Sequence, residues 1–232
     1  MAAPATRAVG VIGFARSAEG GAARAPPPPV GGSANWLFAE DACGYLPGEG
    51  GAILVVEDAA RARERGRRTY GEIAGYAATF DPPPGSGREP GLLRAAQLAL
   101  ADADVVADDV DVVFADAAGI PADDAVEAHA LAKLFGPRGV PVTAPKTMTG
   151  RLNSGAGVLD VATALLAIRD GIIPPTVNVP RVAAGYEIDL VTGDARAAQV
   201  RTALVLARGA GGFNAAVVVR PAHDSFEEER SR

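Results

Sequence analysis

The 232-residue chain is poor in several residue types on which particular functions depend. Its single cysteine, Cys43, excludes an internal disulfide and a cysteine-based zinc cluster. Its net charge of −6 and pI near 5.0 argue against binding to nucleic acid or to a membrane surface. No apolar run approaches the ~20 residues that cross a bilayer, and the N-terminal VGVIGFA is cut off by Arg16, too early for a secretory signal. We therefore expect a soluble, cytoplasmic protein.

Composition divides the chain into three parts. Residues 1–37 include the stretch ARAPPPPVGGSA, which cannot continue a helix or strand, and we expect this part to be disordered. Residues 38–221 alternate between apolar segments and turn residues, which is typical of a folded domain. Residues 222–232 are mostly charged and predict a mobile tail.

The folded part alternates between strand-like and helix-like patterns, so we expect an α/β fold with a mixed sheet and packed helices. Its first apolar run, GAILVVE, predicts a buried strand. Pro121 suits the first turn of one helix and Gly171 the end of another. The predicted strands cover residues 51–57, 69–80, 110–116, 139–145, 200–208 and 214–220, and the predicted helices cover 58–66, 91–103, 121–135 and 158–171.

Most isolated candidates for chemistry favour structural interpretations. The glycine-rich RGAGGFN at 208–214 lacks the spacing of a phosphate-binding loop and predicts a tight connection between two strands. Cys43 has no histidine near it in sequence and is interpreted as a small buried apolar residue. His129 in mid-helix and His223 in the tail have no partner at metal-ligand spacing. We therefore expect no metal and no cofactor.

The stretch PKTMTGRLNSGAG at 145–157 is the most informative. Asn153 and Ser154 suit the cap of the helix that follows, and the small residues after them allow close approach to another backbone. If the loop is buried, Lys146 needs an acidic partner, which Asp160 on that helix could supply. Residue chemistry alone leaves a structural ion pair and a catalytic one equally open.

Five segments together resemble the β-ketoacyl synthases. They are GYLPGEGGAILVVE, VVFADAAGIPADDAVEAHAL, PKTMTGRLNSGAG, GIIPPTVN and GAGGFNAAVVV, in the family's order and spacing, between about Phe38 and Arg220. The resemblance implies the C-terminal half of a thiolase-like fold. Ketosynthases take their cysteine nucleophile from the first half of that fold, which has no counterpart in this sequence. We expect a half-fold to expose an apolar face of its sheet.

The resemblance also implies that the family's active site is altered. The two family histidines, which assist decarboxylation and stabilise an oxyanion, correspond to Asp116 and Arg151, whereas Lys146 matches a family lysine and Asp160 its acidic partner. Ala210 stands where a phenylalanine gates the acyl pocket. A carboxylate would repel the oxyanion, and arginine cannot exchange a proton near neutral pH. Condensing chemistry is therefore not expected at this site.

This pattern is similar to that of the chain-length factors of type II aromatic polyketide synthases. The resemblance implies a non-catalytic subunit that forms a heterodimer with an active ketosynthase, contacts the acyl chain on an acyl carrier protein, and helps to set polyketide length. Two alternatives remain from the sequence. One is an acyltransferase with altered chemistry at Asp116, Arg151 and Lys146, with Cys43 as its only thiol; the other is a truncated, inactive remnant.

Overall fold

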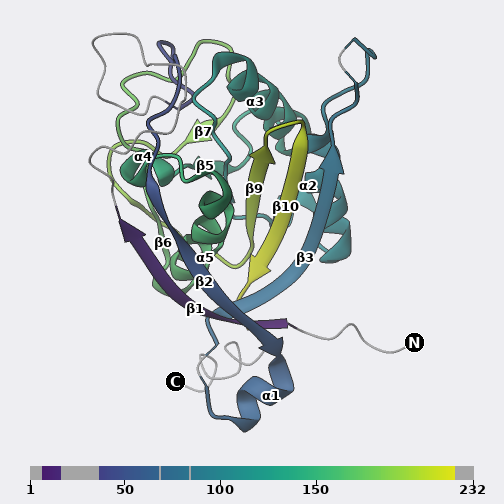
Figure 1. The fold of residues 1–232 in the computed structure, drawn as a ribbon, viewed down its shortest axis with the longest axis vertical. Coiled ribbons are helices and arrows are strands. Elements are labelled where there is room, and N and C mark those ends of the chain that lie inside the picture. The colour runs from purple at the N-terminus through teal and green to yellow at the C-terminus, as the bar shows by residue number, and fades with distance from the viewer. Residues whose placement is uncertain (1–6, 17–36, 68, 84, 223–232) are drawn as a thin grey trace.

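The computed structural model describes residues 7–16, 37–67, 69–83 and 85–222, and its main feature is one mixed sheet of eight strands (Figure 1). The strands β2, β1, β3, β10 and β9 are antiparallel neighbours, and β9, β4, β5 and β7 continue as parallel neighbours. In spatial order the strands are β2 (Glu49–Asp58), β1 (Arg7–Arg16), β3 (Gly71–Phe80), β10 (Phe213–Arg220), β9 (Ala203–Gly209), β4 (Val112–Phe114), β5 (Pro141–Thr143) and β7 (Asp189–Leu190). The expected α/β class is confirmed.

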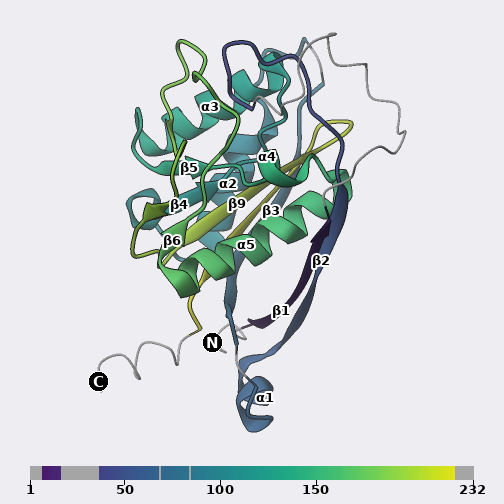
Figure 2. The same ribbon diagram turned by 90° about the vertical axis from the view of Figure 1, so that its left-hand side faces the viewer.

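Helices cover both faces of this sheet (Figure 2). Helix α2 (Gly91–Asp102) packs on β3 and β10, with α3 (Pro121–Phe135) beside it, and α5 (Ala156–Asp170) packs on the opposite face against β9, β10 and β2. The remaining elements are short: α1 (Ala59–Glu64), α4 (Lys146–Thr149), the 3-10 turns η1 (Ala107–Asp109) and η2 (Asn153–Gly155), and a small antiparallel pair of β6 (Ile172–Ile173) and β8 (Arg196–Ala197). No helix in the described ranges is long and apolar enough to span a bilayer.

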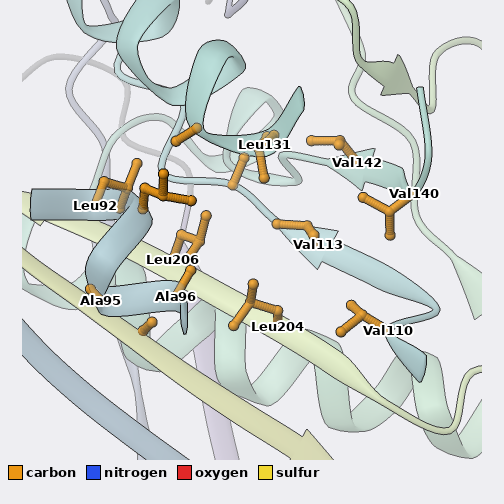
Figure 3. Close-up of a cluster of buried hydrophobic side chains, with 14 of the residues drawn as sticks. Leu92, Ala95, Ala96, Val110, Val113, Leu131, Val140, Val142, Leu204 and Leu206 are labelled. Carbon is orange, nitrogen blue, oxygen red and sulfur yellow. The ribbon is translucent and has the colours of Figure 1, made fainter. Parts of the chain in front are cut away.

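Two apolar clusters fill the layers between helices and sheet. The cluster under α2 and α3 includes Val113 and Leu204 (Figure 3), and the cluster under α5 includes Val112 and Phe114. Successive residues of β4 thus face opposite layers, and both layers are apolar. This explains why apolar and polar residues do not alternate within the VVF of this strand. Each of these side chains contributes roughly 1.5–3 kcal/mol when fully buried.

Helix α2 can approach the sheet closely because β3 has glycine at the point of contact. A Cβ atom on Gly75 would lie 2.2 Å from the carbonyl oxygen of Ala99. The helix presents Ala95, Ala96 and Ala99 on its buried face, so small residues meet on both sides.

Two expectations about the first strands are wrong. Residues 7–16, within the segment expected to be disordered, form β1, which pairs along its whole length with β2. The segment VGVIGFA is too short for a signal sequence. Its apolar and β-branched residues, however, favour a strand. The proline-rich stretch and the charged tail lie outside the described residues.

The second expectation that is wrong concerns GAILVVE, which the sequence predicted to be a buried strand. It forms β2, but this strand is largely exposed, and the side chain of Ile53 is 65% accessible. It is the terminal strand of the sheet, and α5 reaches only part of one face.

Candidate functional site

The candidate site is built around the loop that follows β4. Ala117 in this loop has a φ of 45°, a left-handed conformation that is unusual for a residue other than glycine. The carboxylate of Glu127 accepts the backbone N–H groups of Asp116 and Ala117 at 2.8 and 2.7 Å. Asp124 accepts the N–H of Gly119 at 3.0 Å. Helix α3 therefore holds the loop in place through two buried carboxylates.

Burial governs the ionisation of both carboxylates. It raises the pKa of Glu127 to about 7, with a further contribution from the charge of Asp116, while the backbone N–H donors and Lys146 oppose the rise. Burial also raises the pKa of Asp124 to about 6, against the N–H groups of Phe38 and Gly119. The sequence analysis did not identify either carboxylate as a site residue. The missed signal was their spacing: positions 124 and 127 share a face with buried Leu131.

Lys146 and Asp160 form a buried ion pair, with 2.7 Å between Nζ and Oδ2 and both side chains about 4% exposed. The Lys146 ammonium also donates to the carbonyl oxygens of Ala115 at 2.5 Å and Asp116 at 3.0 Å. Burial raises the pKa of Asp160, although Lys146 opposes this. The structure thus brings together the two residues that the sequence paired, and it ties them to the loop after β4.

Asp116 and Arg151 form a second ion pair, at 2.8 Å between Oδ2 and Nη2. The other guanidinium nitrogen, Nη1, donates to the carbonyl oxygens of Asp116 and Ala117. The second carboxylate oxygen of Asp116 accepts the backbone N–H of Arg208 at 3.0 Å. The guanidinium also lies 5.3 Å from the ring centre of Tyr45, within range of a cation–π contact.

Glycines place Arg151 in this position. The segment before β2 runs beside it: the Arg151 N–H donates to Leu46 O at 2.8 Å, and the Gly48 N–H donates to Arg151 O at 3.0 Å. A Cβ atom on Gly48 would lie 2.1 Å from the Thr149 oxygen, and Gly150 has a φ of 77°. The glycines of GYLPGEGG and of KTMTGR therefore serve one close contact.

The start of α5 differs from the expected capping. Asn153 and Ser154 lie in η2, and neither makes a side-chain cap hydrogen bond to α5. Asn153 instead adopts a φ of 49°, and the chain enters the helix directly from the 3-10 turn. The expected close approach is present, because a Cβ atom on Gly155 would lie 2.5 Å from the Gly50 oxygen.

The remaining predicted residues lie at the surface. Ala210 is exposed in the turn between β9 and β10, the tight connection that the glycines predicted. Cys43 is exposed, contrary to the expectation of a buried apolar residue, because the segment around it runs over the outside of the loop after β4; its neighbour Gly44 donates to Gly119 O. His129 is exposed on α3, and His223 lies outside the described residues.

The chemistry available to this arrangement is limited. Both carboxylate oxygens of Asp116 already accept hydrogen bonds, and Asp116 raises the pKa of Arg151 despite the burial that would lower it. Arg151 therefore cannot exchange a proton near neutral pH, and the Asp116 carboxylate is engaged as a hydrogen-bond acceptor on both oxygens. Within the described part of the chain, no three His, Cys, Asp or Glu side chains gather closely enough to hold a metal ion.

Comparison with known proteins gives this site a family context. The actinorhodin polyketide putative beta-ketoacyl synthase 2 of Streptomyces coelicolor and the tetracenomycin polyketide synthase ketoacyl synthase beta subunit of Streptomyces glaucescens are each 61% identical to this chain over 184 residues. Residues 70–180 match the beta-ketoacyl synthase C-terminal domain. The chain is therefore similar to the β-ketoacyl synthases over most of its length. The match covers 79% of this chain and 45% of each relative, so the chain spans about half the length of these curated relatives.

A solved structure shows the same similarity at the level of the fold. The ishigamide ketosynthase/chain length factor has a TM-score of 0.78 and 29% identity over 92% of this chain and 54% of that chain. The expected fold, the C-terminal half of a thiolase-like β-ketoacyl synthase fold, is thereby confirmed. The two ion pairs lie within the part of the chain that these comparisons cover.

Proposed function

We propose that this protein acts as the chain-length factor of a type II polyketide synthase. In this role it is a non-catalytic β subunit that forms a heterodimer with a ketosynthase α subunit in the cytoplasm. It helps to set the length of the polyketide that grows on an acyl carrier protein. The boundaries expected from the sequence, with residues 38–221 as the β-ketoacyl synthase C-terminal domain, belong to the same proposal.

The observation that carries this proposal is the Asp116–Arg151 ion pair. The resemblance to ketosynthases puts a histidine at each of these two positions, and the ion pair consumes the groups that would have to serve the reaction. A negative carboxylate at position 116 also opposes the charge that develops on a thioester oxygen. Support comes from the relatives, whose names describe a polyketide ketoacyl synthase beta subunit and a ketosynthase/chain length factor.

The proposal is tested by producing a type II ketosynthase α subunit and its acyl carrier protein with and without this protein. We expect loss or shortening of the polyketide when this protein is omitted, measured by mass spectrometry of the products. Equal product length and yield in both cases would exclude a role in setting length.

A second measurement addresses catalysis by the chain itself. The double substitution D116H/R151H restores histidine at both positions, yet we expect no condensation of malonyl and acyl thioesters, because the family nucleophile has no counterpart in this sequence. Condensation by the purified wild-type chain alone would contradict a non-catalytic role.

A further inference from the structure

A group of polar side chains lies where β9 and β10 meet their connecting turn. We call it the hairpin cluster; it consists of Asp81, Asp123, Arg208 and Asn214. Its members come from the loop after β3, the first turn of α3, the end of β9 and the start of β10. The cluster therefore joins segments that are up to 133 residues apart in sequence.

Arg208 is the centre of the hairpin cluster. Its Nη2 donates to Asp81 at 3.5 Å, its Nη1 donates to the carboxylate and the carbonyl oxygen of Asp123 at 3.4 and 3.3 Å, and its Nε donates to Asn214 at 3.4 Å. Only 14% of the side chain is exposed. Each contact is long, but one planar guanidinium reaches three different segments, an arrangement that a lysine cannot reproduce.

Asp81 and Asn214 connect the hairpin cluster to the turn itself. The fully buried Asn214 donates to the Asp81 carboxylate at 2.8 Å and to the Gly212 oxygen at 3.1 Å. The backbone N–H of Asp81 donates to the same Gly212 oxygen at 2.7 Å. Gly212 has a φ of 82°, and a Cβ atom there would lie 3.0 Å from that of Asp81. The last residue of the turn is thus fixed from two sides.

The first side of the turn is connected to the ion pair described above. The backbone N–H of Arg208 donates to Oδ1 of Asp116, whose Oδ2 binds Arg151. The position of the Arg208 backbone thus affects the orientation of the Asp116 carboxylate. All three altered positions, 116, 151 and 210, lie within two residues of this chain of contacts.

We propose that Arg208 is a positioning residue that fixes the turn 210–212 and the Asp116–Arg151 ion pair in a single arrangement. Its side chain holds the end of β9 against α3 and the loop after β3, and its backbone holds the Asp116 carboxylate. The turn and the ion pair then depend on the same residue for their positions.

Hydrogen exchange of the 232-residue chain tests this role. The reporters are the amides of Asp81, which donates to the turn, and of position 208, which donates to Asp116. We expect Arg208→Met to increase exchange at both reporters by at least about tenfold relative to amides of β4, the scale expected when hydrogen bonds to charged groups are lost. Arg208→Lys, which keeps the charge but not the planar fork, should restore only part of the protection.

Arg220→Met is the matched control. Arg220 pairs with the buried Glu72 at the far end of β10, so its loss removes an ion pair from the same β9–β10 hairpin without touching the turn. The proposal would be overturned if both methionine variants increased exchange by the same factor at the reporters and at the amides of β4. Arg208 would then stabilise the fold as a whole and would not position the turn. Unchanged reporters would overturn it as well. If Arg208→Met does not fold, the same comparison with Arg208→Lys decides. No polyketide is measured, so the result is independent of the proposed function.

Discussion

At the scale of single residues, the charged side chains of the site are paired with one another. Asp116 and Arg151 form an ion pair with each other. The Lys146 ammonium is paired with Asp160 and donates hydrogen bonds to two backbone oxygens. Breaking such a pair leaves a buried charge without compensation, which costs more than the intact pair contributes. The site is thus a structural unit whose energetics can be measured without any reaction.

Removal of Arg151 tests this at the residue scale. We expect Arg151→Met to lower the free energy of unfolding by about 3 kcal/mol, because the buried Asp116 carboxylate then loses its cationic partner and keeps the Arg208 amide as its donor. The double variant D116N/R151M should recover part of this loss, since its amide carries no charge. Urea unfolding of the wild type, both single variants and the double variant gives the coupling energy. Additive losses would show that the two residues do not interact.

Glu127 predicts a dependence on pH. Burial raises its pKa to about 7 in the folded protein, whereas the unfolded value is about 4.3. The stabilisation that results is complete below the unfolded pKa and disappears as the pH rises through about 7. The unfolding free energy of the wild type minus that of Glu127→Gln should therefore fall between pH 5 and 7.5, by up to roughly 3 kcal/mol.

The comparison with Glu127→Gln isolates this residue, because Asp124 titrates in both proteins and cancels in the difference. Chemical unfolding at a series of pH values provides the measurement. A difference that stays constant or increases with pH would mean that the Glu127 carboxyl is already ionised throughout.

At the scale of elements, the sequence predicted most helices and strands because their patterns are local. The strand at 110–116 and the helices at 91–103 and 121–135 are present within a few residues. What it missed depends on contacts between distant segments. Arg208 contacts Asp81, which is 127 positions away in the sequence. The spacing of apolar residues along the chain does not predict a contact of this kind. Lys146 and Asp160, in contrast, are 14 positions apart and were paired from the need of a buried cation for a carboxylate.

The packing of α2 on β3 supplies a prediction at this scale. Gly75→Ala would place a methyl group 2.2 Å from the Ala99 oxygen, so helix and strand must separate. We expect a loss of about 1–3 kcal/mol in the free energy of unfolding. Gly157→Ala in α5 is the control: its nearest neighbour is the Ala207 Cβ at 3.6 Å, and alanine favours a helix over glycine by roughly 0.5–1 kcal/mol. Thermal melts should thus move in opposite directions.

At the scale of the whole molecule, one face of the sheet is only partly covered. Gly75 and Ala77 of β3 face α2, so the alternate residues Tyr76 and Phe80 point to the opposite face, where they are 50% and 71% exposed. Phe213 pairs with Phe80 in register and meets it edge to face at 5.4 Å. On this face α5 covers β9 and part of β10, and β1 and β2 diverge from β3 (Figure 2). The exposed apolar face expected of a half-fold is therefore present.

This face predicts how the 232-residue chain behaves by itself. Contiguous exposed aromatic side chains favour self-association and the binding of apolar dyes. We expect the double substitution Y76S/F80S to reduce both, measured by light scattering and dye fluorescence, while the free energy of unfolding changes by only about 0.5 kcal/mol per exposed site. The control is Val106→Ser, which removes a side chain that is 64% exposed in the connection before η1. If the control reduces association as much as the double variant, exposed apolar residues in general, and not this face of the sheet, cause the association.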